Sequence, residues 1–189
     1  MKKKLKSLVL CSILSATTVI ADESLVAIEG TYGGLNVDSE VVSTGLAKND
    51  NVSLAGGGLK IGAQSDNYRL FLSANYYAAS NDDYNYVATY GIELDYLIKL
   101  SKSFGVFLGV NGGMANIEQI DTTGIKRTSS DPYFGGAAGI NIHVSRSVDF
   151  ELGGRMLIMD ISNTRNDVKY TYNSLASGYA SIIFKFKMN

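Results

Sequence analysis

The sequence predicts an all-β fold: an eight-stranded antiparallel up-and-down transmembrane β-barrel that forms after a signal peptide is cleaved. Three observations predict this fold: an N-terminal export signal, eight segments with period-two alternation, and connections that alternate between short and long. The composition agrees, because 20 Gly, 12 Tyr, one Pro and no Trp in 189 residues are more typical of strands than of helices.

The first 21 residues have the features of a secretory signal peptide. A lysine-rich start precedes the apolar segment 8–20, and Ala21 provides a small residue for cleavage. Serines and threonines interrupt the apolar segment, which is also shorter than the ~20 residues that a spanning helix needs. The predicted organisation is therefore a signal peptide of residues 1–21 and one outer-membrane β-barrel domain of residues 22–189.

Cys11 is the single cysteine of the chain, and Leu10 is too large to precede the lipidated cysteine of a lipoprotein. Cleavage after Ala21 leaves a mature chain without cysteine, and therefore without disulfides or thiolate chemistry. Removal of four lysines and no acids changes the formal net charge from −1 to −5. A mildly acidic exported domain has no electrostatic case for binding nucleic acid.

Eight segments of roughly ten residues alternate between an apolar face and a mixed face, as membrane strands do. The alternation is clearest in residues 68–77 and 89–98, where one face carries tyrosine, leucine and isoleucine. The full set is 26–32, 57–64, 68–77, 89–98, 104–111, 134–144, 150–158 and 179–186.

The predicted connections alternate in length around the barrel. Tight turns are expected at 65–67, 99–103 and 145–147, and longer polar loops at 35–55, 78–86, 115–131 and 160–174. Outer-membrane barrels have short periplasmic turns and longer extracellular loops. With the N-terminus in the periplasm, every long loop is expected outside the cell.

Aromatic residues indicate which face meets lipid. In a soluble barrel of the lipocalin kind the apolar faces would line a cavity. Here aromatic residues lie at both ends of the apolar faces, which is typical of a surface that crosses two membrane–water interfaces. The predicted girdles are Tyr68, Tyr96, Phe104, Phe150 and Phe186 on the periplasmic side, and Tyr32, Tyr76, Tyr90 and Phe134 on the outer side.

In these features the chain resembles the small eight-stranded outer-membrane β-barrel superfamily, which includes OmpX-like and OmpA-type transmembrane domains and opacity-like, porin-family surface proteins. Residues 26–33, 104–113 and 150–155 look like strands of these proteins. The resemblance implies the cell outer membrane of a Gram-negative bacterium, contact with its lipid and lipopolysaccharide, and recognition of the last strand by the barrel-assembly machinery. That strand usually ends on an aromatic residue, whereas here three residues follow Phe186.

Eight charged residues fall on the face predicted to line the lumen: Glu29, Lys60, Arg69, Glu93, Asp95, Glu151, Arg155 and Lys185. Their heights predict the pairs Glu29–Lys60, Arg69–Asp95 and Glu151–Lys185, with Arg155 and Glu93 reaching across the lumen. In one interpretation the charges satisfy one another, because a lone buried charge is costly. In the other they line a small ion path, although eight strands leave an interior that side chains fill.

Catalytic and metal-binding patterns are weak in this sequence. His143-Val144-Ser145 resembles the His-x-Ser arrangement of outer-membrane lipid A deacylases. The alternation turns His143 into the lumen at the periplasmic end, whereas lipid A occupies the outer leaflet. One histidine and no cysteine in the mature chain are too few ligands for a typical transition-metal site. We therefore expect no cofactor and no catalytic residues.

Three functions therefore stay open for the chain. The sequence favours a structural or surface-display protein whose extracellular loops are available to a host or envelope partner, since loops on a rigid scaffold commonly carry function. A narrow porin-like channel is the alternative, and a lipid A-modifying enzyme is the remote alternative.

Overall fold

The computed structural model of the protein describes residues 21–80, 84–120, 126–165 and 168–188. The predicted signal peptide, apart from Ala21, lies outside the described residues. Across those four ranges no helix has the length and hydropathy that a membrane span requires.

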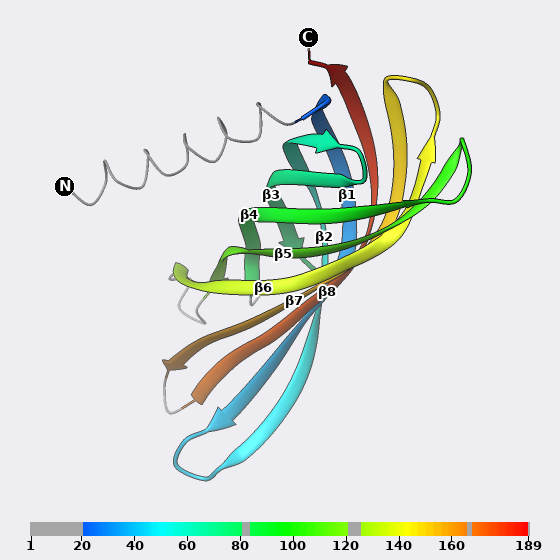
Figure 1. Ribbon diagram of the computed structural model, residues 1–189. Helices are drawn as coiled ribbons and strands as arrows, with labels where there is room; N and C mark the ends of the chain where they lie inside the picture. The colour runs from blue at the N-terminus through cyan, green and yellow to red at the C-terminus, as the bar shows by residue number, and fades with distance from the viewer. Residues whose placement is uncertain (1–20, 81–83, 121–125, 166–167, 189) are drawn as a thin grey trace, which may run out of the picture.

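Eight antiparallel strands form a closed barrel, which confirms the predicted fold class (Figure 1). Each strand pairs with the next along the chain, and β8 closes the ring against β1. The strands are β1 Glu23–Val41, β2 Leu46–Ser65, β3 Tyr68–Ala79, β4 Tyr84–Lys99, β5 Phe104–Ile120, β6 Lys126–His143, β7 Val148–Arg165 and β8 Val168–Lys187.

The barrel has two different ends. One end, called the turn end here, carries both termini of the described barrel and the short connections 66–67, 100–103 and 144–147. These connections agree with the predicted tight turns. The opposite end, called the hairpin end, carries the β1–β2, β3–β4, β5–β6 and β7–β8 connections.

The strands are longer than predicted, because most residues expected in the loops 35–55, 115–131 and 160–174 belong to strands. β2 and β8 each reach 20 residues. Inward positions of these segments remain apolar and buried, as at Leu35 and Val52. Their outward faces are polar, so the alternation that marks a strand inside lipid is weaker there although the backbone ladder continues.

The strands reach different heights at the hairpin end. β3 and β4 are joined by a short hairpin, and the β2–β3 ladder stops at Leu54–Ala79. Residues 46–52 of β2 consequently pair with β1 alone within the described part of the chain.

A second gap opens between β6 and β7, whose ladder begins only at Tyr133–Met159. Among the described residues, 126–132 pair with β5 alone and 161–165 with β8 alone. The hairpin end is therefore divided into a β7-β8-β1-β2 sheet and a β3-β4-β5-β6 sheet (Figure 1).

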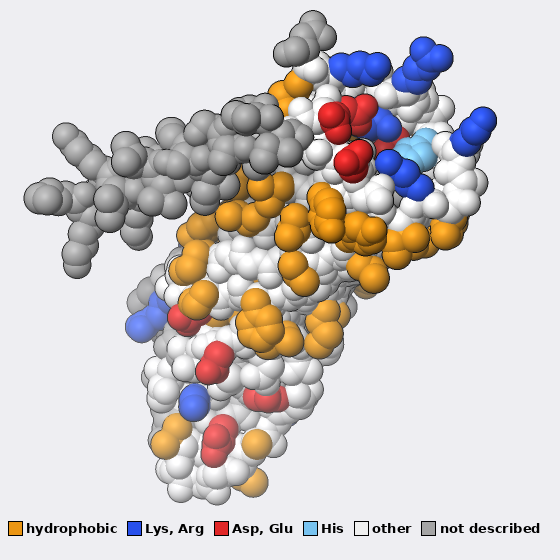
Figure 2. Space-filling view, in the orientation of Figure 1, with side chains coloured by type: hydrophobic (Ala, Val, Ile, Leu, Met, Phe, Trp, Pro, Cys, Tyr) orange, Lys and Arg blue, Asp and Glu red, His pale blue; other side chains and the backbone are white. Residues whose placement is uncertain are grey.

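Exposed apolar side chains lie on every strand, and on the face that Figure 2 shows they form a belt across the barrel. Large outward residues such as Ile28, Leu59 and Leu108 are more than half exposed. Beyond the belt, towards the hairpin end, the surface is mainly polar. The strand segments beyond the belt, residues 35–54, 115–133 and 159–175, are called the outer extension below.

Candidate functional site

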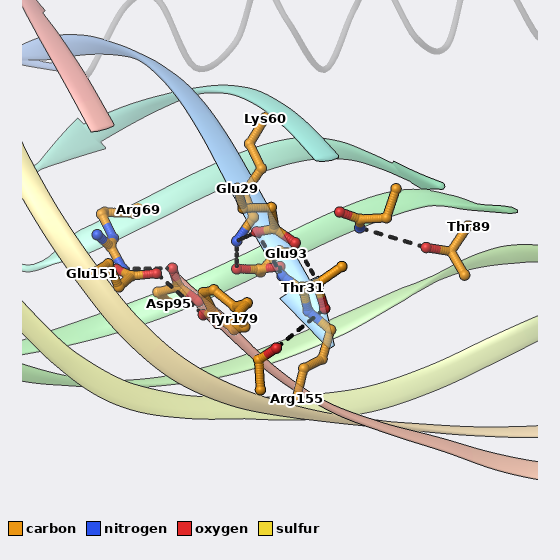
Figure 3. A network of polar contacts seen from close by, with 12 residues as sticks. Glu29, Thr31, Lys60, Arg69, Thr89, Glu93, Asp95, Glu151, Arg155 and Tyr179 are labelled. Carbon is orange, nitrogen blue, oxygen red and sulfur yellow. Dashed lines mark hydrogen bonds and ion pairs between the residues drawn. The ribbon is translucent and has the colours of Figure 1, made fainter. Parts of the chain in front are cut away.

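One cluster of four charged side chains fills part of the lumen. Lys60 Nζ lies 3.0 Å from Glu29 Oε2 and 2.8 Å from Glu93 Oε1. Arg155 donates to the same two carboxylates, from Nη1 to Glu29 Oε1 at 2.9 Å and from Nη2 to Glu93 Oε2 at 3.2 Å (Figure 3). All four side chains are almost fully buried, so two cations and two carboxylates neutralise each other out of contact with solvent.

A second cluster lies nearer the turn end. Arg69 Nη2 donates to Asp95 Oδ2 at 2.9 Å and to Glu151 Oε2 at 2.6 Å. The Tyr179 hydroxyl donates to the other oxygen of Glu151 at 3.1 Å. One cation thus faces two carboxylates, and the Tyr179 hydroxyl supplies a further hydrogen bond to Glu151 (Figure 3).

The structure brings together most of the charges expected in the lumen, with one different pairing. Glu151 bonds across the barrel to Arg69 instead of to Lys185, so the predicted Glu151–Lys185 pair is wrong. Lys185 Nζ lies 2.7 Å from Asp149 Oδ1, because Lys185 is closer to the turn end and meets the first acid of β7. Asp149 also contacts His143 Nδ1 at 2.9 Å.

Tyr179 and Asp149 are lumen residues that the sequence analysis did not single out. The ring of Tyr179 lies beneath both cations of the first cluster, 4.8 Å from Lys60 Nζ and 4.7 Å from Arg155 Cζ. Gly153 makes room for it, because a Cβ there would lie 2.7 Å from Tyr179 Cζ. The inward position of Tyr179, opposite a glycine on the neighbouring strand, was the available signal.

Apolar layers enclose the charges on both sides. Towards the turn end, small clusters include Leu25, Phe71, Leu97 and Phe107. Towards the hairpin end, a larger cluster receives buried side chains from all eight strands: Leu35, Val37, Val52, Leu54, Tyr77, Val87, Ala115, Ile117, Tyr133, Leu157, Met159, Ile161, Tyr172 and Leu175. The ionic layer is therefore separated from the hairpin end by an apolar core, and hydrophobic constrictions oppose the passage of ions.

The predicted girdle residues lie on the outer surface. Tyr32, Tyr68, Tyr76, Tyr90, Tyr96, Phe134 and Phe186 are exposed, and Phe104 and Phe150 are half-buried. Tyr68 and Tyr96 on neighbouring strands pack with ring centroids 5.1 Å apart. Exposed rings at both borders of an aliphatic belt match the amphipathic interfaces of a bilayer.

His143 and Ser145 have different hydrogen-bond partners in the structure. His143 contacts Asp149, while the Ser145 hydroxyl accepts a hydrogen bond from the Ser147 N–H in the same turn. Both lie at the turn end, away from the outer extension. Within the described residues, no group of three or more His, Cys, Asp or Glu side chains is arranged to hold a metal ion.

Comparisons with solved structures identify the fold. No protein-family model and no curated protein sequence matches the chain. The structure is similar to outer membrane protein OprG from Pseudomonas aeruginosa, with a TM-score of 0.64, 12% identity, and coverage of 89% of this chain and 97% of that one. It is also similar to Neisserial surface protein A, with a TM-score of 0.62, 14% identity, and coverage of 87% and 97%.

A third similar structure is the N-terminal β-barrel domain of Pseudomonas aeruginosa OprF, with a TM-score of 0.54, 12% identity, and coverage of 88% of this chain and 98% of that one. One of the three is described as an outer membrane protein, one as a surface protein and one as a β-barrel domain, and all align over nearly their full length. The chain therefore shares the β-barrel fold of these three proteins.

Proposed function

We propose that the chain is an outer-membrane protein whose plugged barrel anchors and displays the outer extension for contact with a host or another envelope component. The observation that carries this proposal is the continuation of the strands well beyond the apolar belt into a polar, partly split β-structure. The charged and apolar layers of the lumen support an anchor more than a pore.

The outer surface supports a place in the bilayer. The outward face is apolar and bordered by aromatic rings, and closure of β8 against β1 satisfies the backbone groups that lipid cannot. In this orientation the turn end is periplasmic and the hairpin end extracellular. Residues 1–21 act as the export signal, lipid and lipopolysaccharide surround the belt, and β8 is the strand offered to the barrel-assembly machinery.

The outer extension presents polar strand edges to a partner. Lys48 carbonyl accepts from Ser39 across the β1–β2 hairpin, and Ser53 carbonyl accepts from Ser80 on the other side. Because backbone groups alternate along a strand, those of Asn49 and Asn51 point away from β1. Among the described residues these groups have no strand partner, and such an edge favours an extended segment of a partner protein, held by main-chain bonds.

Cysteine labelling on intact cells tests both the location and the orientation. With Cys11 removed in the signal peptide, the mature chain has no cysteine background. Thr44→Cys, at the exposed β1–β2 tip, is expected to react with a membrane-impermeant maleimide on intact cells. Lys102→Cys, at the exposed β4–β5 turn, is expected to react only after lysis.

The same pair of variants gives the contradicting outcomes. Labelling of Lys102→Cys on intact cells with protection of Thr44→Cys would reverse the orientation. Protection of both variants until lysis, together with recovery of the protein in the soluble periplasmic fraction, would refute the membrane barrel and revive the lipocalin-like alternative.

A narrow porin-like channel is supported by the charged lumen lining alone. We expect purified protein in planar bilayers to give no sustained, large single-channel current, because paired charges and an apolar layer fill the path. Long-lived openings of large conductance would favour the channel over the plugged anchor.

A further inference from the structure

The turn end carries two copies of the same short motif. The β4–β5 turn reads Leu100-Ser-Lys-Ser103, and the β6–β7 turn reads Val144-Ser-Arg-Ser147. In each, the first two backbone N–H groups donate to the carbonyl of the residue that opens the next strand, Phe104 or Val148, at 2.9–3.1 Å. The two turns therefore share sequence pattern, hydrogen bonding and shape.

In each turn, serine side chains on both sides of the cation, Lys102 or Arg146, stabilise the turn. Ser101 Oγ accepts from the Ser103 N–H at 3.3 Å, and Ser145 Oγ accepts from the Ser147 N–H at 3.2 Å. Accepting leaves each hydroxyl its own proton to donate. Each turn thus combines a positive charge with hydroxyl donors, which is the chemistry that recognises a phosphate oxygen.

The apolar residue that begins each turn places it against lipid. Leu100 and Val144 are 60% and 65% exposed. They continue the outward alternation of Ile98 and Ile142 on the same strands. An exposed apolar side chain two residues before an exposed cation is the arrangement expected at a membrane surface, where the stem lies in lipid and the charge reaches the headgroups.

Charge is distributed unevenly around the turn end. Exposed cations lie on the β4–β8 side, where Lys and Arg side chains gather in Figure 2, and acids lie on the β1–β3 side. Lys185 and His143 are engaged by Asp149, whereas no ion pair of Lys102 or Arg146 is found among the described residues. The cations are Lys99, Lys102, Arg146 and Lys187, and the acids are Asp22, Glu23 and Asp66.

We propose that the β4–β5 and β6–β7 turns form a paired binding site for the phosphate groups of anionic phospholipids in the periplasmic leaflet. The two turns are linked through the barrel rim, since the His143 N–H donates to the Ser103 carbonyl and the Lys185 N–H to the Ser147 carbonyl. This inference rests on the proposed membrane orientation. The acidic β2–β3 turn at Asp66 has no such motif, and its carbonyl accepts a hydrogen bond from Lys99 Nζ at 3.2 Å.

Native mass spectrometry of the protein released from nanodiscs tests the site. With equal phosphatidylglycerol and phosphatidylcholine, wild-type protein is expected to retain phosphatidylglycerol preferentially. In Lys102→Gln/Arg146→Gln the preference falls by about fivefold for each cation removed, the factor that corresponds to ~1 kcal/mol per basic residue at an anionic surface. The exchange variant Lys102→Arg/Arg146→Lys keeps the preference.

The matched control is Arg127→Gln/Lys169→Gln, which removes the same two charges from exposed positions at the hairpin end. It is expected to retain the wild-type preference. An unchanged preference in the turn variant, or an equal loss in the control, would overturn the site. Binding of the wild-type protein to peptidoglycan instead of lipid would overturn the site as well.

Folding of each variant is checked by its mobility shift between boiled and unboiled gel samples. If the turn variant does not fold, salt provides the test on the wild type, because raising ionic strength from about 0.1 M to about 1 M shortens the Debye length from ~10 to ~3 Å. A preference that salt leaves unchanged would overturn the site. Absence of the mobility shift in the wild type would instead refute the proposed membrane barrel.

Discussion

Arg155→Met is expected to destabilise the folded barrel by about 3–5 kcal/mol, the cost of removing one partner of a buried ion pair and leaving the other charge uncompensated. Arg155 donates to Glu29 and Glu93, and its loss leaves Lys60 as the single cation between two buried carboxylates. The expected result is a lower urea midpoint in detergent. Far-UV circular dichroism and gel mobility are suitable probes, since the chain has no tryptophan.

Neutralising the whole cluster separates lost charge balance from lost packing. The variant Glu29→Gln/Lys60→Met/Glu93→Gln/Arg155→Met is expected to be more stable than Arg155→Met. It leaves no buried charge in the cluster, whereas Arg155→Met leaves a carboxylate without its cation. Lys169→Met, on an exposed residue, controls for the substitution itself. Equal stability of Arg155→Met and the wild type would mean that solvent reaches the cluster.

Leu94→Arg is expected to cost about 2–4 kcal/mol in folding into a bilayer, the range for a cation near the bilayer midplane on the lipid face. Leu94 is 45% exposed on the outer surface of β4, between the girdle residues Tyr90 and Tyr96. The measurement is the free energy of unfolding from lipid vesicles in urea.

Ser162→Arg provides the comparison for that variant. Ser162 is also exposed, but it lies in the outer extension, where water surrounds it, so the expected change is within about 0.5 kcal/mol. In a soluble barrel both exposed positions would accept arginine equally. Similar small effects at Leu94 and Ser162 would therefore contradict the membrane assignment of the belt.

In the lumen, the sequence predicts well the contacts between side chains on neighbouring strands. Counting residues from the turn end gives the heights of Glu29 and Lys60, or of Arg69 and Asp95, because each pair lies on neighbouring antiparallel strands. The structure places these side chains within ion-pair distance.

Contacts across the lumen depend on the three-dimensional shape of the barrel, which counting residues along the strands does not give. Arg69 reaches Glu151 from β3 to β7, a contact that depends on the curvature of the closed barrel. The place of Tyr179 in the lumen is harder to predict, because an aromatic ring on the mixed face carries no charge to pair. The strands are longer than predicted for a different reason: beyond the belt the outward face becomes polar, so the outward apolar pattern ends although the ladder continues.

The pairing of β1 with β8 has a consequence for how the molecule comes into being. Glu23 pairs with Lys187 and Val41 with Val168, so the first strand obtains its second partner only when the last strand arrives. Contacts at such sequence separation make assembly slow, because a long loop must close before they form. Until then two strand edges stay open, and the unfinished chain is exposed to aggregation. Its success in the cell therefore depends on the order and timing of strand addition as much as on the stability of the finished ring.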